Sequence, residues 1–288
     1  MTTSRDLAEV LRYAAFTDDP AGGNPAGIVL NAGSLDDAER LRIASDIGYS
    51  ETAFLVARTG SDSEYDVRYF SPQAEVPFCG HATIATAVAL GERAGEGDHI
   101  FHIRGGSIPV STARDEAGAL TASLISLEPT VEEVSAADLA TALRALNWSE
   151  PDLDPTLPPK IAYAGARHLI LATRTSERLS QLDYAFDTLR DFMLSRDLTT
   201  IDLVHRVEDS LYEARNPFPV GGVYEDPATG AAAAAFGAYL RELGRVVTPA
   251  RVTVLQGQHM GRPSRILVDI PTHGPITIRG TAVPIAVT

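Results

Sequence analysis

Four side chains in this sequence are of types that move protons, and each stands beside a glycine, a proline or an apolar run. They are Glu51, Cys79, His81 and Asp226. A carboxylate, a thiol or an imidazole can take a proton from one atom of a substrate and return it to another. The chemistry that these residue types favour is therefore general acid–base catalysis.

Each of these side chains also has a purely structural interpretation. Asp226 followed by Pro227 is the residue pair that a helix prefers at its N-cap and first position. His81 could be a packed or capping histidine, and Glu51 a solvated residue at the start of a strand. Cys79 could be a small buried apolar residue, although a helix N-terminus would lower its pKa and sharpen its nucleophilicity. The residue types alone leave both interpretations open.

The elements that must position these side chains are short strands with a few helices between them. Ser34 with Asp37, and Ser135 with Asp138, have the spacing of helix N-terminal caps. Helices are expected at residues 34–48, 81–93, 135–146, 182–195 and 226–243. Strands are expected at 26–30, 52–57, 65–70, three more positions up to about 125, 161–173, 199–207, 211–215, 251–255, 265–270 and 276–287.

The order of elements occurs twice, which predicts an internal duplication. Arg68 precedes Cys79 by 11 positions, and Arg215 precedes Asp226 by the same 11. Both arginines end a strand and lead through a proline-bearing loop to a helix of small residues. Such a helix is apolar all round, so we expect it to be buried on every side by a curved sheet. The fold class predicted is α+β, with two pseudo-symmetric lobes, each a barrel-like and mostly antiparallel sheet wrapped around a central helix.

The N-terminus of each small-residue helix is a potential anion site. Its unpaired backbone N–H groups and the positive end of the helix dipole can hold a carboxylate. Two such helices from lobes that face each other would bind a small acid between them. The duplication therefore predicts a small-molecule carboxylate as the substrate.

Composition narrows the classes of function. The net charge is −14 and the acidic residues are spread along the chain, which argues against a nucleic-acid or membrane surface. No stretch approaches the roughly 20 apolar residues of a membrane helix, and no signal sequence follows the first methionine. A single cysteine fits a reducing compartment, so we expect a cytoplasmic protein. Schiff-base chemistry would have to use the only lysine, Lys160.

Motifs for cofactors and for other catalytic classes are missing. There is no glycine-rich nucleotide motif and no serine-hydrolase motif. His99 and His102 are three positions apart on an expected strand, which places them on opposite faces. We therefore expect no metal site and no cofactor.

Four strings, in matching order and spacing over nearly the whole chain, resemble the PhzF-like family of phenazine biosynthesis. They are Gly23-Asn24-Pro25-Ala26, Ser50-Glu51-Thr52-Ala53-Phe54, Glu75-Val76-Pro77-Phe78-Cys79-Gly80-His81-Ala82-Thr83 and Glu225-Asp226-Pro227-Ala228-Thr229-Gly230. The fold of that family is similar to those of diaminopimelate epimerase and proline racemase. The resemblance thus implies the two-lobed fold that the duplication predicts.

The resemblance also implies site residues and a reaction. Glu51 inherits the role of proton carrier, with His81 and Asp226 as catalytic partners that bind and polarise the substrate. The family enzyme isomerises dihydro-hydroxyanthranilate by an allylic proton shift in secondary-metabolite biosynthesis. The substrate-binding residues expected by the same comparison are Asn24, Cys79, Gly80, Thr229, Gly230 and Ala231.

For the whole molecule the resemblance implies a homodimer. The expected lobes are residues 1–128 and 129–274, and the last segment, about 275–288, returns to complete the first lobe.

Two departures leave alternatives open. Ala231 stands where family members often carry serine, which puts the substrate in doubt. Cys79 matches one catalytic cysteine of the epimerase and racemase relatives, and the position of the second is taken as Asp226. One cysteine excludes a two-thiol racemase, but an epimerase that uses Cys79 with Asp226 stays an alternative, as does a family member that only binds a small molecule.

Overall fold

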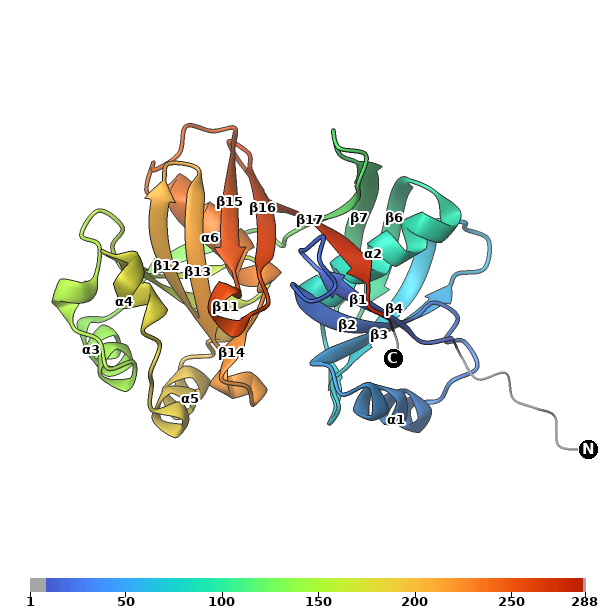
Figure 1. Cartoon of the computed structure of the whole chain (residues 1–288), viewed down its shortest axis with the longest axis horizontal. Coiled ribbons are helices and arrows are strands. Elements are labelled where there is room, and N and C mark those ends of the chain that lie inside the picture. The colour runs from blue at the N-terminus through green and yellow to red at the C-terminus, as the bar shows by residue number, and fades with distance from the viewer. Residues whose placement is uncertain (1–8, 287–288) are drawn as a thin grey trace, which may run out of the picture. The chain divides into compact units, whose positions relative to one another are not determined.

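The computed structural model describes residues 9–286, which divide into two compact units. Unit 1 comprises the chain up to residue 124 together with the segment from 280 onward, and unit 2 comprises residues 125–279. Each unit is a barrel-like, mostly antiparallel sheet around a central helix, so the predicted α+β class is confirmed (Figure 1).

Unit 1 is built on the pairing order β1–β2–β3–β4–β6–β7–β8. The β2–β3 and β4–β6 pairs are parallel and the others antiparallel, and the end of β17 adds to the free side of β1. Its elements are β1 (Leu11–Ala15), β2 (Asn24–Val29), α1 (Asp37–Ile47), β3 (Glu51–Ala57), β4 (Glu64–Phe70), β5 (Glu75–Val76), α2 (Gly80–Ala94), β6 (Gly97–Ile103), β7 (Gly106–Arg114) and β8 (Leu120–Ile125).

Unit 2 repeats this order as β10–β11–β12–β13–β15–β16–β17, with β11–β12 and β13–β15 as the parallel pairs. Strand β9 adds to β10. Its strands are β9 (Thr130–Glu133), β10 (Lys160–Tyr163), β11 (Arg167–Thr173), β12 (Thr200–Glu208), β13 (Leu211–Pro217), β14 (Glu225–Asp226), β15 (Ala250–Gln256), β16 (Ser264–Ile270) and β17 (Thr277–Pro284). Its helices are α3 (Ala136–Ala145), α4 (Ser176–Ser180), α5 (Phe186–Ser195) and α6 (Gly230–Glu242), with 3₁₀ turns at Glu150–Asp152, Pro219–Gly221 and Gln258–Met260.

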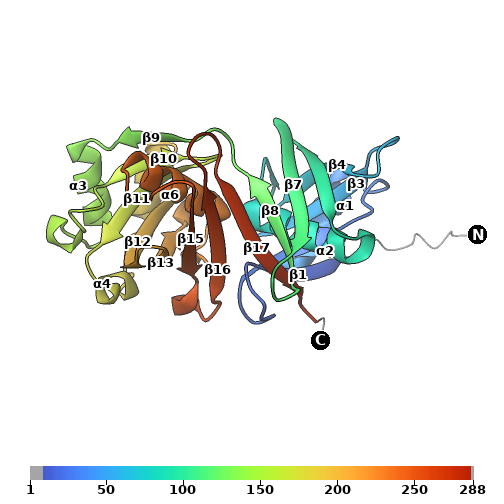
Figure 2. The same ribbon diagram turned by 90° about the horizontal axis from the view of Figure 1, so that it is seen from above.

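The two central helices, α2 and α6, are buried on all sides, as their composition predicts. In α2 every residue from His81 to Gly91 is buried, and the strands of unit 1 enclose it. Figures 1 and 2 show α6 enclosed in the same way by the sheet of unit 2. A Cβ atom on Gly237 would lie 2.7 Å from Val268 Cγ1, so only a glycine permits this approach of helix and sheet.

Each unit contains one arginine–glutamate ion pair at the equivalent position, and these two ion pairs mark the duplication. Arg68 on β4 donates Nε and Nη2 to Glu75 on β5, at 2.7 and 2.8 Å. Arg215 on β13 donates the same two nitrogens to Glu225 on β14, at 2.9 and 2.6 Å. The two bidentate pairs occupy equivalent strands of the two units.

The register of the duplication differs from the expected one. Cys79 is the N-cap of α2, whereas Thr229, and not Asp226, is the N-cap of α6. Arg68 is 12 positions before the first residue of α2, and Arg215 is 15 before that of α6. The connection between the arginine and the central helix is therefore longer in unit 2, where it contains the 3₁₀ turn Pro219–Gly221. Because of this longer connection, the residue of unit 2 that corresponds to Cys79 is Thr229 and not Asp226.

Some of the helix ends predicted from local sequence are confirmed, and others lie at different residues. Ser135 accepts a hydrogen bond from the backbone of Asp138 and caps α3, as expected. The capping box of α1 is formed by Asp36 and Glu39, not by Ser34 and Asp37, although the helix ends at Gly48 as predicted. Helix α5 begins at Phe186, later than predicted, since α4 and an extended segment precede it. The connecting helices pack with Trp148 in a separate apolar cluster of unit 2.

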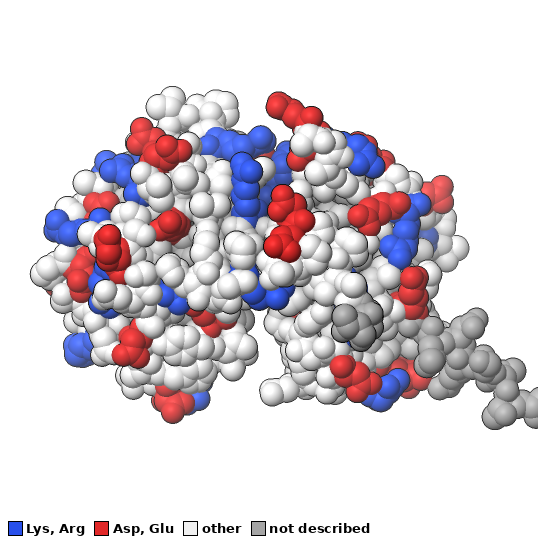
Figure 3. Space-filling model, in the orientation of Figure 1, with Lys and Arg blue, Asp and Glu red and all other residues white. Residues whose placement is uncertain are grey.

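The surface carries both signs of charge. Figure 3 shows acidic side chains interspersed with lysine and arginine side chains over the face in view. Within residues 9–286, no helix combines the length and the apolar character that crossing a membrane requires.

Candidate active site

Glu51, Cys79 and His81 form one cluster in unit 1. Glu51 is the first residue of β3, Cys79 caps α2, and His81 lies in the first turn of that helix. The Cys79 thiol donates to Glu51 Oε2 at 3.5 Å, and His81 Nε2 lies 3.5 Å from the same oxygen. The Glu51 side chain is 17% exposed and His81 is buried, so the carboxylate stands at the accessible edge of a buried polar group.

Asn24 orients the imidazole of His81. Its amide nitrogen Nδ2 lies 3.1 Å from His81 Nδ1. Because an amide nitrogen can only donate, Nδ1 accepts and the ring proton is on Nε2. Nε2, which carries this proton, lies 3.5 Å from Glu51 Oε2 and 3.4 Å from the Ser50 Oγ.

Burial lowers the pKa of His81, and the nearby Glu51 carboxylate opposes part of this shift. The imidazole is therefore a neutral donor at neutral pH. A neutral imidazole can donate a hydrogen bond to a substrate group or to a carboxylate without adding a positive charge to the site.

The sheet and the helix together bring these residues into contact. Strands β2 and β3 are parallel neighbours with Ala26 opposite Glu51, which places Asn24 beside the start of β3. Thr83 in α2 donates to the carbonyl oxygen of Cys79 at 2.7 Å and accepts from the buried Tyr69 hydroxyl at 2.7 Å. This chain of bonds holds the first turn of α2 against β4.

A second polar cluster surrounds Asp226 in unit 2. Asp226 lies in β14, so its interpretation as the helix N-cap is wrong. The Thr229 hydroxyl donates to Asp226 Oδ2 at 2.6 Å. Gln256 donates to the Asp226 carbonyl oxygen at 2.7 Å and accepts from the Thr229 backbone N–H at 3.0 Å. The Asp226 carboxylate is thereby held by Thr229, three residues later in the same loop.

Gly80 and Gly230 are the first residues of α2 and α6, and both are at the helix N-termini as expected. Ala231 follows Gly230 as His81 follows Gly80. The position that lacks the serine common in the family is thus the counterpart of His81 in the other unit.

Sequence reasoning missed Ser50 and Gln256. Nothing in the local sequence marks Ser50 as a site residue. Only its position next to Glu51 could have indicated that it contacts His81. Gln256 ends β15 and is fully buried, yet a glutamine in a strand gives no local sign of a partner 27 positions away. Gly257 after it has a φ of +81°, and a Cβ there would lie 2.7 Å from the Pro227 carbonyl oxygen.

The cluster in unit 1 also contains a potential set of metal ligands. One ligand atom each from Glu51, Cys79 and His81 lies within 4.8 Å of the others. The sequence shows no metal spacing because Glu51 and Cys79 are 28 positions apart. What these residues can do together is donate and accept protons at one point, or hold a cation there.

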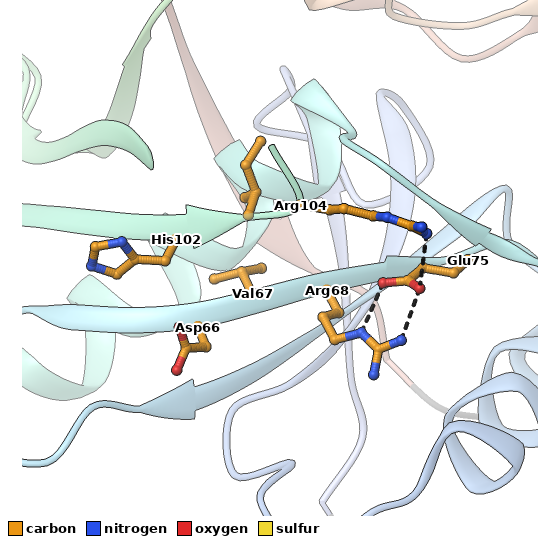
Figure 4. A pocket seen from close by; sticks show the side chains of 7 residues that line it. Asp66, Val67, Arg68, Glu75, His102 and Arg104 are labelled. Carbon is orange, nitrogen blue, oxygen red and sulfur yellow. Dashed lines mark hydrogen bonds and ion pairs between the residues drawn. The ribbon is translucent and has the colours of Figure 1, made fainter. Parts of the chain in front are cut away.

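A separate surface depression of unit 1 lies beside β4 and β6. Its lining is Asp66, Val67, Arg68, Glu75, His102, Ile103 and Arg104 (Figure 4). Glu75 binds Arg68 and lies 3.6 Å from Arg104 Nη1, so the charges here are already compensated. This depression shares no lining residue with the cluster around Glu51, which we take as the candidate site.

The chain is similar to known proteins over most of its length. Residues 13–287 match the family model of the phenazine biosynthesis-like proteins. The trans-2,3-dihydro-3-hydroxyanthranilate isomerase of Pseudomonas aeruginosa is 30% identical, over 88% of this chain and 86% of that one. The crystal structure of the PhzF-family phenazine biosynthesis protein of Bacillus anthracis has a TM-score of 0.85 at 25% identity, covering 96% and 98%. A probable proline racemase from Agrobacterium radiobacter shares the fold, with a TM-score of 0.65 at 11% identity over 96% and 91%.

Proposed function

Because this chain belongs to the phenazine biosynthesis-like protein family and is an isomerase, we propose that it moves a proton between two carbons of a small carboxylate-bearing metabolite. Glu51 is the proton carrier. The observation that carries the proposal is the Glu51 carboxylate itself, which is largely buried and held by the Cys79 thiol and the His81 imidazole at one oxygen.

The reaction needs one group that is first a base and then an acid. The Glu51 carboxylate takes a proton from an sp³ carbon beside a double bond, and the electron pair of the broken C–H bond moves into a new C=C bond. The old double bond shifts its electrons to the far carbon, which receives the proton back from the Glu51 carboxyl group. Atoms and charge balance without a co-reactant, and the same face of the substrate is used twice.

Both of the contacts described are made to Glu51 Oε2. Oε1 has neither of these partners, so it is the oxygen that we assign to the substrate proton. The donors on Oε2 fix the plane of the carboxylate, and a fixed carboxylate can reach two carbons of a bound substrate in turn.

Two observations support the proposed substrate class, the helix N-terminus and the name of a relative. Backbone N–H groups at Gly80 and His81 begin α2, where the helix dipole would stabilise a substrate carboxylate. The Pseudomonas aeruginosa relative is named for an anthranilate derivative, which carries a carboxylate. We assign Asp226 and Thr229 to polar groups of the substrate, by the family resemblance.

The test is deuterium incorporation from D₂O, followed by NMR over a panel of cyclic and amino-acid-like carboxylates. We expect incorporation by the wild type and a loss of at least about 100-fold in Glu51→Gln, because a positioned acid–base group contributes roughly 10²–10⁴. The position of the label identifies the reacting carbon. Exchange that persists in Glu51→Gln would show that Glu51 is not the carrier.

A second candidate function uses Cys79 as the proton carrier of an epimerase. The observation that favours it is the Cys79 sulfur, 3.4 Å from His81 Nδ1 and 3.5 Å from Glu51 Oε2, since both groups could accept the thiol proton. Cys79→Ser discriminates the two. Loss of exchange in Cys79→Ser with exchange retained in Glu51→Gln assigns the epimerase, and the reverse assigns the isomerase.

A further inference from the structure

Three side chains on the outer face of unit 1 form a series of carboxylate, imidazole and hydroxyl groups. His102 Nε2 lies 2.7 Å from Glu64 Oε2, and His102 Nδ1 lies 2.8 Å from Ser107 Oγ. The two contacts use different nitrogens of one ring, and both have normal hydrogen-bond lengths. The side chains of Glu64 and His102 are 35% and 23% exposed, and Ser107 is exposed. The series is therefore open to small molecules in solution.

Three neighbouring strands hold this series in place. His102 on β6 is directly opposite Ser107 on β7. Glu64 on β4 pairs with Ile100, two residues before His102 on β6. Because residues two apart on a strand point to the same face, the strand pairing brings all three side chains to the outer face. Side chains on paired strands are held more precisely than side chains on loops.

The hydrogen bonds give each side chain a chemical role. A carboxylate can only accept, so Nε2 of the neutral imidazole carries the ring proton and donates it to Glu64. Nδ1 is then an acceptor, and the proton between Nδ1 and Ser107 is the hydroxyl proton. The Ser107 hydroxyl thus donates to a base that is itself oriented by a carboxylate, which is the arrangement that activates a serine nucleophile.

Local sequence gives no sign of this series. Glu64 and His102 are 38 positions apart, and Ser107 lies in a β-hairpin strand rather than in the turn of a serine-hydrolase motif. Such a series is recognised by geometry and by the roles of its members, and not by their order in the chain.

We propose that Ser107 is an activated nucleophile that takes an acyl group from an activated ester, with His102 as its base and Glu64 as a positioning residue. The Ser107 oxygen forms a bond to the carbonyl carbon of the ester while the hydroxyl proton passes to His102 Nδ1. The bond from that carbon to the leaving oxygen breaks, and the leaving group departs with the electron pair. The imidazolium then releases its proton to solvent, and Ser107 remains acylated.

The surroundings select the class of acyl donor. An exposed serine on the face of a sheet contributes little binding energy, so the donor must carry a leaving group that departs without a proton, such as a phenolate. The depression shown in Figure 4 has a volume of about 470 Å³, and its lining includes His102, Ile103 and Arg104. This depression has room for a small aryl ester beside the imidazole.

The test treats the full chain with p-nitrophenyl acetate and locates the acetyl group by peptide mapping with mass spectrometry. Mapping is needed because the Cys79 thiol and the Lys160 amine can also be acetylated. We expect acetylation at Ser107 in the wild type and its loss in Ser107→Ala. His102→Gln should slow acetylation of Ser107 by at least about 100-fold, because a positioned base contributes roughly 10²–10⁴.

The positioning role of Glu64 has a separate readout. Glu64→Leu removes the acceptor at His102 Nε2, so we expect the Nε2–H tautomer of His102 to lose its dominance in ¹⁵N NMR spectra. Acetylation of Ser107 should slow by about tenfold in the same variant. An unchanged tautomer in Glu64→Leu would remove Glu64 from the proposal.

Ser111→Ala is the matched control. Ser111 lies on the same face of β7 as Ser107, but its partner on β6 is Asp98 and not a histidine. This variant should leave the acetylation of Ser107 unchanged. A wild-type rate at Ser107 no greater than at Ser111, or a rate at Ser107 unchanged in His102→Gln, overturns the proposal. Circular dichroism establishes that each variant is folded, and His102→Asn serves if His102→Gln is not.

Discussion

The contact between Asn24 and His81 decides which ring nitrogen carries the proton, and so what the imidazole can offer to Glu51. Asn24 is fully buried and comes from β2, while His81 comes from α2. Neither residue type alone determines this. The donor nature of the amide nitrogen at Nδ1 sets the tautomer, which places the ring proton on Nε2, 3.5 Å from Glu51 Oε2.

Replacing Asn24 by leucine should therefore change both the tautomer and the reaction. The buried Nδ1 loses its donor, so we expect the free energy of unfolding to fall by about 1–3 kcal/mol. We also expect the Nε2–H tautomer to lose its dominance in ¹⁵N NMR spectra, and deuterium exchange to slow by about tenfold. Ser50→Ala, which alters only the contact to Nε2, should keep the tautomer. An unchanged tautomer in Asn24→Leu would refute this account.

At the scale of elements, the two arginine–glutamate pairs perform the same task in different surroundings. Arg215 and Glu225 are nearly fully buried, with side chains 9% and 4% exposed, and Arg215 also donates to the Ser180 carbonyl oxygen at 2.7 Å. Arg68 and Glu75 are 33% and 20% exposed, and Asp37 also binds Arg68. Solvent therefore compensates a broken pair in unit 1 but not in unit 2.

The matched substitutions Glu225→Gln and Glu75→Gln test this difference. Glu225→Gln leaves Arg215 buried without a counter-charge, so we expect a loss of about 3–5 kcal/mol in the stability of unit 2. Glu75→Gln should reduce the stability of unit 1 by no more than about 1 kcal/mol. Fluorescence of the single tryptophan, Trp148, reports urea unfolding of unit 2, and hydrogen exchange of β4 amides reports unit 1. Equal losses in the two variants would argue against the role of burial.

At the scale of the whole molecule, stability depends on a buried polar chain in unit 2. His168 Nδ1 donates to the Thr200 hydroxyl at 2.8 Å, which donates to Asn216 Oδ1 at 2.6 Å. Asn216 Nδ2 donates to Asp202 Oδ1 at 3.0 Å. Burial raises the pKa of Asp202 to about 7, which the bond from Asn216 opposes, and burial lowers the pKa of His168 to about 3.

These two shifts give opposite pH dependences. In the unfolded chain Asp202 ionises at the ordinary aspartate pKa of 3.8, so between about pH 4 and 7 the folded state holds the extra proton and stability falls as pH rises. In the unfolded chain His168 is protonated below the ordinary histidine pKa of 6.5, so stability falls as pH drops from there towards 3. Between about pH 4 and 6.5 the two contributions should nearly cancel.

Single substitutions should reveal each slope. Relative to wild type, Asp202→Asn should gain stability as pH rises from about 4.5 to about 6.5, by about 1.4 kcal/mol per pH unit, because it removes the falling contribution. His168→Asn should change by a similar amount in the opposite direction. Urea unfolding followed by Trp148 fluorescence at several pH values measures both. Parallel curves for wild type and variants would contradict the shifted pKa values.

Strand β17 also matters for the whole fold, since its residues Ala282 to Pro284 pair with β1 in unit 1. A Cβ on Gly280 would lie 2.4 Å from Cδ1 of the fully buried Phe16. Gly280→Ala should therefore destabilise unit 1 by about 1–3 kcal/mol through overpacking. Gly97→Ala is the control, because a Cβ there meets nothing within 4 Å. Hydrogen exchange of the Phe16 amide, which bonds the Thr281 carbonyl oxygen, should accelerate only in Gly280→Ala.

Local sequence determined the features that depend on neighbouring residues. The small residues of α2 and α6 required burial on all sides, Ser135 determined the start of α3, and Gly48 the end of α1. The repeated order of elements was sufficient to predict two similar sheets around central helices. Composition and periodicity carry this information because propensity, capping and the apolar face act over a few residues.

Only the tertiary structure decided how the reactive side chains meet. Asn24 and His81 are 57 positions apart, and Glu51 and Cys79 are 28 apart. The parallel pairing of β2 with β3 and the burial of α2 bring them into contact. Likewise, the longer loop before α6 made Thr229 the helix cap and left Asp226 in β14. Hydrogen bonds between distant segments depend on strand order and loop length, which no local pattern of residues encodes.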